Sequence, residues 1–206
     1  MSNVIDLNEN DRSPSESSFM SEMFSKYANW KILLHFIKNP TGEFYVNEVS
    51  GSLEVGRGTA SQSLRLLASM GLLRRIERGN LCHYRLNDCI LTRELKRMYV
   101  ISVLSRLGVA ERLVGESPSI LTVALYGSYS SGGWDEKSDI DLLVVTAGGQ
   151  NVDYMQSIEE ASNVLGAEIN VEAVPSSVWL NLRESRDAFY ESIIRNHIVL
   201  YGGELP

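Results

Sequence analysis

Apolar residues in the first part of the chain recur at helical spacing. From about residue 19 to residue 38 they are spaced three and four apart, and the run 39–42 (Asn-Pro-Thr-Gly) breaks the pattern. We expect a second, shorter helix over about 46–53. A third helix is predicted to be capped by Thr59 and to stop at Gly71.

After the third helix, the apolar and polar positions alternate with a period of two. This alternation lies on both sides of Gly79-Asn80, a pair that favours the tight turn of a β-hairpin. The first half of the chain is therefore predicted to contain three helices followed by two antiparallel strands.

The second half begins with another helical pattern, over 91–113. Apolar strands are predicted over 120–126, 140–145 and 168–174, with a helix over about 154–165 between the last two. Strands and helices mixed in this way indicate an α+β domain with a mixed sheet and flanking helices.

These patterns divide the chain into four parts. We expect a disordered tail over 1–18, because its polar residues cannot bury enough surface to offset the entropy of ordering. A helix-and-hairpin domain over 19–90 and a linking or dimerisation helix over 91–115 follow. The α+β domain is expected over 116–206.

Charge differs between the two halves, although the whole chain of 206 residues carries a formal net charge of −7. The segment from Val55 to Val100 contains nine basic and three acidic residues, whereas the segment from Ile101 onward contains six basic and fifteen acidic residues. A basic region beside an acidic domain is typical of a protein that brings only one part to nucleic acid.

The sequence shows no features of a Cys-x-x-Cys metal or redox protein, of a secreted protein or of a membrane protein. Cys82 and Cys89 are too far apart for a Cys-x-x-Cys metal or redox pair, and we interpret them as small apolar residues. Without an apolar run of about 20 residues or a signal-like start, we expect a cytoplasmic protein with no membrane partner.

Candidate chemistry lies in the run 125–145, where Gly127-Ser128 follows an apolar strand and Asp139-Ile140-Asp141 opens the next. Glycine lets backbone amides approach a phosphate closely, because it has no β-carbon. Asp139 and Asp141, two apart on a strand, point to the same face with backbones about 7 Å apart. Two convergent carboxylates are stable with a cation nearby, and magnesium prefers carboxylate and phosphate oxygens.

On this motif, residues 118–203 resemble the minimal nucleotidyltransferases of the polymerase-β-like superfamily. The resemblance implies that Gly127 and Ser128 hold the phosphates of a nucleoside triphosphate (NTP), and that Asp139 and Asp141 bind Mg²⁺. It also implies a third carboxylate on a later strand, which helps to activate the acceptor hydroxyl.

The third position departs from the family pattern, because Asn170 stands where the later aspartate is expected. An amide cannot act as a general base. Glu168 and Glu172 share the same face of the predicted strand, so either is a candidate, and we favour Glu172 as the catalytic carboxylate. Solvated strand-edge residues remain the alternative for both.

Residues 30–87 resemble the winged-helix family, particularly its arsenic-repressor-like and multiple-antibiotic-resistance-regulator-like branches, in the runs Gly58–Leu67, Met70–Arg75 and Tyr84–Leu86. The resemblance implies that the third helix enters the major groove of DNA and that the hairpin lies along its backbone. The expected DNA-binding residues are Arg57, Thr59, Ser61, Gln62, Arg65, Arg74, Arg75 and Arg78.

Three functions follow from these resemblances. One is a Mg²⁺-dependent nucleotidyltransferase, placed on nucleic acid or on a partner protein by a winged helix. Another is a catalytically weak or inactive regulator of transcription that senses a nucleotide. A third is an antitoxin-like protein that modifies a partner. We also expect a homodimer, with the apolar stripe over 95–107 as its interface.

Overall fold

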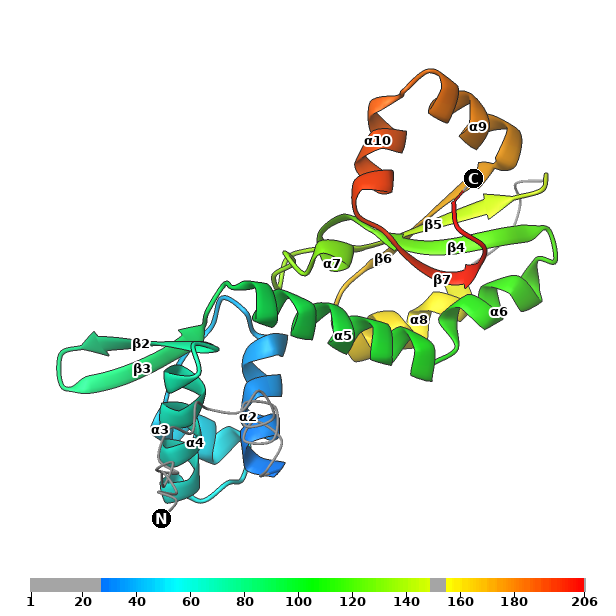
Figure 1. Ribbon diagram of the computed structural model, residues 1–206. Coiled ribbons are helices and arrows are strands. Elements are labelled where there is room, and N and C mark those ends of the chain that lie inside the picture. The colour runs from blue at the N-terminus through cyan, green and yellow to red at the C-terminus, as the bar shows by residue number, and fades with distance from the viewer. Residues whose placement is uncertain (1–26, 149–154, 206) are drawn as a thin grey trace, which may run out of the picture. The chain divides into compact units, whose positions relative to one another are not determined.

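A computed structural model describes residues 27–148 and 155–205, and contacts divide these residues into two compact units (Figure 1). The first unit contains the described residues up to Phe36 together with Glu43–Arg85. The second contains Ile37–Gly42 and the described residues from Leu86 onward. The tail expected over 1–18 lies outside the described residues, and the predicted domain limits stay predictions.

The first unit has the hairpin and the three helices expected from the sequence, and the beginning of the first helix, expected near residue 19, lies outside the described residues. A short additional strand pairs with the second hairpin strand in a sheet of order β1-β3-β2. In chain order, the elements are α2 (Tyr27–Lys38), β1 (Glu43–Tyr45), α3 (Val46–Ser52), α4 (Arg57–Ser69), β2 (Leu73–Arg78) and β3 (Leu81–Leu86).

Helix α4 begins two residues before the predicted cap. The Ala60 amide donates to the Gly56 carbonyl at 2.9 Å, which closes the first helical turn and makes Gly56 the N-cap. Thr59 therefore lies inside the first turn, with its side chain exposed. Glycine is accepted at an N-cap, so the expectation that Thr59 caps this helix was wrong.

The second unit is built on a mixed sheet of order β6-β5-β4-β7. Its strands are β4 (Ile120–Tyr126), β5 (Ile140–Thr146), β6 (Ile169–Pro175) and β7 (Ile198–Gly202). Strand β5 pairs antiparallel with β4 and parallel with β6, and β4 pairs antiparallel with β7. The expected α+β class with a mixed sheet is confirmed.

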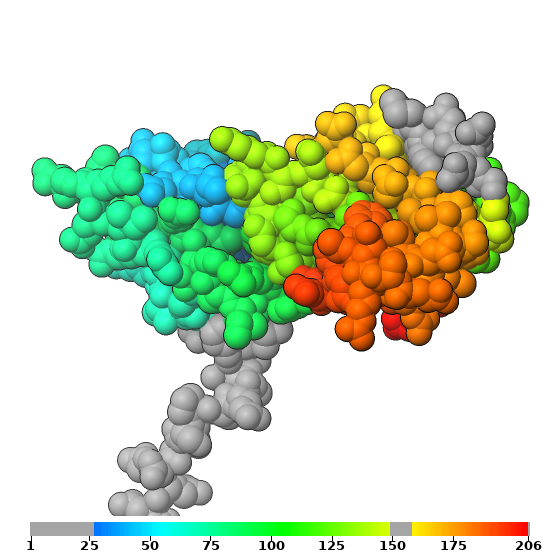
Figure 2. Space-filling view, turned by 90° about the horizontal axis from the view of Figure 1, so that it is seen from above, coloured from blue at the N-terminus to red at the C-terminus, as the bar shows by residue number. Residues whose placement is uncertain are grey.

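Helices cover both faces of this sheet (Figure 1). One face carries α5 (Ile90–Arg106), α6 (Val109–Glu116) and α8 (Met155–Leu165). The opposite face carries α9 (Ser176–Glu184) and α10 (Ala188–Arg195), which lie together at the surface in the space-filling view (Figure 2). Within the described residues, no helix is both long and apolar enough to cross a membrane.

The single helix predicted over 91–113 is two helices. Gly108 has a φ of 62°, a left-handed conformation that suits glycine, and it separates α5 from α6. The apolar stripe expected at a dimer interface is partly buried within the unit. Leu95 and Leu104 are buried, whereas Met98 is 45% exposed. Dimerisation stays a prediction, with less apolar surface on α5 than the sequence pattern indicated.

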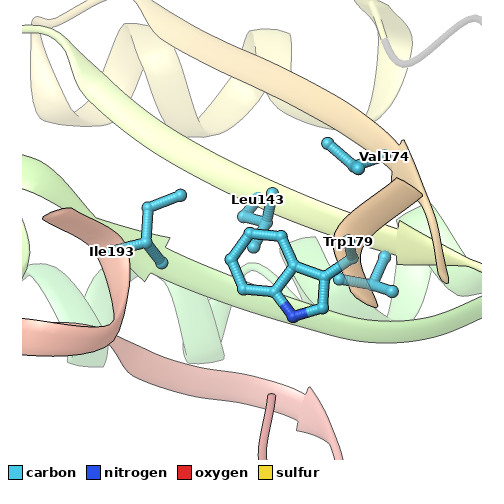
Figure 3. Close-up of a cluster of buried hydrophobic side chains, with 5 residues drawn as sticks. Leu143, Val174, Trp179 and Ile193 are labelled. Atoms are coloured by element: carbon cyan, nitrogen blue, oxygen red, sulfur yellow. The ribbon is translucent and has the colours of Figure 1, made fainter. Parts of the chain in front are cut away.

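The core beneath α9 and α10 is centred on Trp179, whose side chain is fully buried (Figure 3). Its indole lies against Leu143 of β5 and close to Val174 and Ile193. Because these residues come from two strands and two helices, the Trp179 cluster fixes α9 and α10 on the sheet.

We expect Trp179→Ala to lower the free energy of unfolding of the second unit by about 3–5 kcal/mol, because a large cavity would replace the indole. Urea unfolding measures this loss. Val178→Ala on the same helix is the matched control: Val178 is 44% exposed, so its truncation should change stability by less than about 0.5 kcal/mol. Equal effects of the two variants would contradict this account of the core.

Candidate functional site

The candidate site lies where β4 ends beside the start of β5. Tyr126, the last residue of β4, is paired with Asp141 of β5, so the chain leaves β4 next to this carboxylate. Gly127 follows with a φ of +74°, and a β-carbon there would lie 2.6 Å from Asp141 Oδ2. Only glycine fits, because both the backbone conformation and the adjacent carboxylate exclude a side chain.

Gly127 also begins the short helix α7 (Gly127–Ser131), which is tied down by serine hydroxyls. Ser130 Oγ donates to the Asn196 carbonyl at 2.7 Å, and Ser131 Oγ donates to the Ser128 carbonyl at 2.9 Å. Within the part of the chain that the structure describes, the Ser128 hydroxyl makes no hydrogen bond. This half-buried hydroxyl is therefore available to a ligand beside Asp141.

Two aspartates of the motif share one face at the start of β5. Asp139 is exposed and directly precedes the strand, whereas Asp141 is half-buried. Burial raises the pKa of Asp141 and the charge of Asp139 raises it further, while a hydrogen bond from Asn170 lowers it. The net direction is upward, so this pair of carboxylates favours a cation or a proton nearby.

Asn170, the residue expected at the third position, is the parallel partner of Asp141 on β6. Its side chain donates a hydrogen bond to the Asp141 carboxylate, which a carboxylate in its place could do only when protonated. At this position an amide therefore lies beside Asp141.

Glu172, the carboxylate favoured from the sequence, is exposed and is paired with Leu143, two residues further along β5 than Asp141. Burial raises the pKa of the Tyr126 hydroxyl, and the charges of Asp141 and Glu172 raise it further. Tyr126 therefore lies within electrostatic reach of both carboxylates. The sequence analysis did not identify it, because a tyrosine at the end of an apolar strand is a common core residue.

Glu168, the other candidate for the third carboxylate, is exposed immediately before β6. Its carbonyl oxygen accepts a hydrogen bond from the Ile140 amide at 2.8 Å, so its backbone lies beside the start of β5. Glu168 and Glu172 consequently flank Asn170 on the same side of the strand, and the role of each stays a prediction.

The donor set fits a magnesium ion that also contacts a bound phosphate. No group of three or more His, Cys, Asp or Glu side chains able to hold a metal occurs among the described residues. Mg²⁺ is commonly held by one or two carboxylates, with phosphate oxygens and water as its other ligands. Asp139 and Asp141 could supply these two carboxylates, and the Gly127 backbone lies directly beside Asp141.

In the first unit, the residues expected to contact DNA gather on two elements. Arg57, Thr59, Gln62 and Arg65 are exposed on α4, and Ser61 is partly exposed. Arg74, Arg75 and Arg78 are exposed on β2. The two sets are near each other, because Arg75 and Arg65 both oppose the upward shift that burial causes in the pKa of Tyr84 on β3.

Two of the hairpin arginines have acidic partners. Arg78 forms an ion pair with Glu43 at 2.9 Å, and Arg75 pairs with Glu77 at 3.1 Å. Arg75 Nε also donates to Cys82 Sγ at 2.9 Å. These acidic partners reduce the net positive charge that the hairpin presents.

The raised pKa of Asp141 has a consequence for stability. The folded protein binds this proton more tightly than the unfolded chain, so stability falls as pH rises through the pKa. In magnesium-free buffer, we expect Asp141→Asn to increase the free energy of unfolding at pH 7, and the gain to vanish at pH values below the ordinary carboxyl pKa.

Urea unfolding across this pH range measures the effect. Glu159→Gln, which changes an exposed carboxylate on α8, serves as the control and should leave the pH profile of stability unchanged. If Asp141→Asn instead destabilises the protein at pH 7, the ionised Asp141 is stabilised by its surroundings and the assigned electrostatics are wrong.

Comparison with known proteins finds one family match, which lies in the second half of the chain. The family model "Nucleotidyltransferase domain" matches residues 108–200. A search of curated proteins found no match. The match covers Gly127, Ser128, Asp139, Asp141 and Asn170.

Three solved structures are also similar to parts of this chain. A possible transcriptional regulator from Methanosarcina mazei Go1 is 18% identical, with a TM-score of 0.34, over 47% of this chain and 85% of its own. A toxin–antitoxin structure with AMP-PNP is 17% identical, with a TM-score of 0.34, over 48% and 74% of the two chains. The antimony-specific transcriptional repressor AntR is 22% identical, with a TM-score of 0.34, over 54% and 98%. By the family match, residues 108–200 carry a nucleotidyltransferase-family domain.

Proposed function

We propose that the second half of the chain binds an NTP with Mg²⁺ and transfers its nucleotidyl group to an acceptor hydroxyl, with release of pyrophosphate. The observation that carries this proposal is the closeness of Asp141 Oδ2 to Gly127, where a β-carbon would lie only 2.6 Å away. A phosphate held at the Gly-Ser turn would then contact the same cation as the two aspartates.

Each residue has a physical role in this proposal. Gly127 lets the backbone of the Gly-Ser turn lie directly beside Asp141, and the Ser128 hydroxyl donates to a phosphate oxygen. Asp139 and Asp141 would hold the ion, and bound Mg²⁺ would neutralise charge on the phosphates that react. Glu172 is the proposed acceptor of the proton from the attacking hydroxyl, since Asn170 has no basic group.

We expect Asp139→Asn with Asp141→Asn to abolish label transfer from NTPs, because these residues hold the metal. The assay combines purified protein, Mg²⁺ and each labelled NTP, alone and with RNA and protein extracts of the host. The matched control is Glu159→Gln with Glu184→Gln, which removes the same charge at two exposed positions on α8 and α9. Transfer by the double aspartate variant would overturn the assignment of these residues.

A second candidate function is nucleotide sensing without efficient catalysis, and the amide beside Asp141 favours it. In the same assay, Asn170→Asp should raise transfer by at least about tenfold if the third carboxylate limits the rate. A wild-type protein that binds NTP but transfers nothing would favour a sensing regulator. Transfer only to a host protein would favour the antitoxin-like alternative, in which a partner is modified.

The first unit is proposed to bind DNA through α4 and the hairpin of β2 and β3. Exposed donors on α4 suit base edges and phosphates, and the arginines of β2 suit the DNA backbone. Positive charge in this region, in a chain that is acidic as a whole, supports the proposal. The DNA-binding unit would then place the nucleotidyltransferase-family domain on nucleic acid, or would couple nucleotide binding to transcription.

We expect Arg65→Ala to weaken binding to a random-sequence DNA duplex and to reduce the slope of log affinity against log salt by about one. Fluorescence anisotropy over a salt series measures both quantities. Arg106→Ala, an exposed arginine at the end of α5, should change neither. Wild-type binding that does not depend on salt would contradict an interface made of phosphate contacts.

A further inference from the structure

The segment between α7 and Asp139 (residues 132–138, here called the motif loop) packs closely against helix α5. Gly132 ends α7 with a φ of 71°, and a β-carbon there would overlap the carbonyl oxygen of Arg93 on α5. Gly132 thus has two reasons to be glycine, a left-handed backbone and contact with the backbone of another helix. The motif loop therefore begins in fixed contact with α5.

One turn further along α5, Lys96 holds the next part of the motif loop. Its side chain is 7% exposed, its Nζ donates a hydrogen bond to the Trp134 carbonyl oxygen, and it lies 4.8 Å from the centre of the Trp134 ring. Burial lowers the pKa of Lys96, and the charges of Asp88, Asp135 and Glu136 oppose that shift. Burying an ammonium group costs free energy unless the group is hydrogen-bonded. The contacts of Lys96 with Trp134 therefore do more than fill space.

The rest of the motif loop is ordered by hydrogen bonds within the loop and by hydrogen bonds from Thr41. Asp135 Oδ1 accepts hydrogen bonds from the Lys137 amide and from the Ser138 hydroxyl, each at 3.0 Å. Glu136 accepts one hydrogen bond from the Thr41 amide at 2.9 Å and one from its hydroxyl at 2.7 Å. These hydrogen bonds form a turn over residues 135–138, and Asp139 follows it directly.

A second connection runs from Lys96 toward Asp139 through stacked rings. Trp134 stacks on Tyr129 of α7, with ring centres 4.8 Å apart and planes 3° from parallel. Burial raises the pKa of Tyr129 to about 12, and the largest contribution from a charged neighbour is that of Asp139. Tyr129 therefore lies within electrostatic reach of the exposed aspartate of the motif.

We infer that Lys96 is a positioning residue for Asp139: by holding the Trp134 carbonyl and ring, it fixes the motif loop and thus the distance between the two aspartates. The inference rests on the proposed Mg²⁺ and NTP binding. Lys96 itself would touch neither nucleotide nor metal. Replacing Lys96 should therefore reduce the factor by which Mg²⁺ strengthens nucleotide binding, and should change the affinity measured without Mg²⁺ much less.

The test uses the full chain with Lys96→Met, which keeps the length of the side chain and removes its charge and donor. Arg106→Met on the same helix is the matched control, because Arg106 is exposed. Lys96→Arg is the second variant, since it restores a cation and donors. Hydrogen exchange of the motif-loop amides is measured without ligand, and affinity for a non-hydrolysable ATP analogue is measured with and without Mg²⁺.

We expect Lys96→Met to speed exchange of the motif-loop amides and to reduce about tenfold the factor by which Mg²⁺ strengthens nucleotide binding. Affinity without Mg²⁺ should stay within about twofold of wild type, because the Gly127-Ser128 turn is separately tied down. Arg106→Met should match wild type, and Lys96→Arg should recover part of the magnesium effect.

The outcomes separate this inference from the proposed function. Unchanged exchange in Lys96→Met would show that Lys96 does not hold the motif loop. Equal loss of affinity with and without Mg²⁺ would show a general structural role and overturn the positioning role. If wild-type protein binds no nucleotide with or without Mg²⁺, the proposed function fails, whereas the exchange measurement still decides whether Lys96 orders the motif loop.

Discussion

Antiparallel pairing of β4 with β5 is the constraint on which the candidate site depends. It places the end of one strand beside the beginning of the other, so that Gly127 and Asp141 touch although fourteen positions separate them in the chain. The half-buried carboxylate is tolerated because Asn170 donates to it from the neighbouring parallel strand. Three adjacent strands of the sheet, β4, β5 and β6, therefore each help to position one part of the site.

Periodic patterns in the sequence predicted most of the fold, because burial on one face imposes a repeat on long elements. Shorter or interrupted elements were missed for physical reasons. Strand β1 has only three residues, which is too few to show alternation. The break at Gly108 interrupts an apolar pattern that continues on both sides, so it depends on the left-handed backbone of one residue. Thr59 was mistaken for the cap because Gly56, the actual N-cap, has no side chain that would indicate this role in the sequence.

For the site, the sequence identified residues that are close together in the chain or share a strand face. Gly127, Asp139 and Asp141 belong to one short motif, and Asn170 follows from the alternation along β6. The role of Lys96 could not be predicted, because its hydrogen-bond partner Trp134 lies 38 positions further along the chain. The residues around Lys96 in the sequence form an ordinary amphipathic helix. Burial of a single lysine on such a helix depends on tertiary packing.

The amide at position 170 also bears on how such a domain changes over evolutionary time. Codons for asparagine and aspartate differ at one base, so the residue beside Asp141 is one point mutation from a carboxylate. Such a change would alter the charge of the site while keeping the shape of its side chains. A lineage can therefore exchange an amide and an acid beside Asp141 without refolding the sheet.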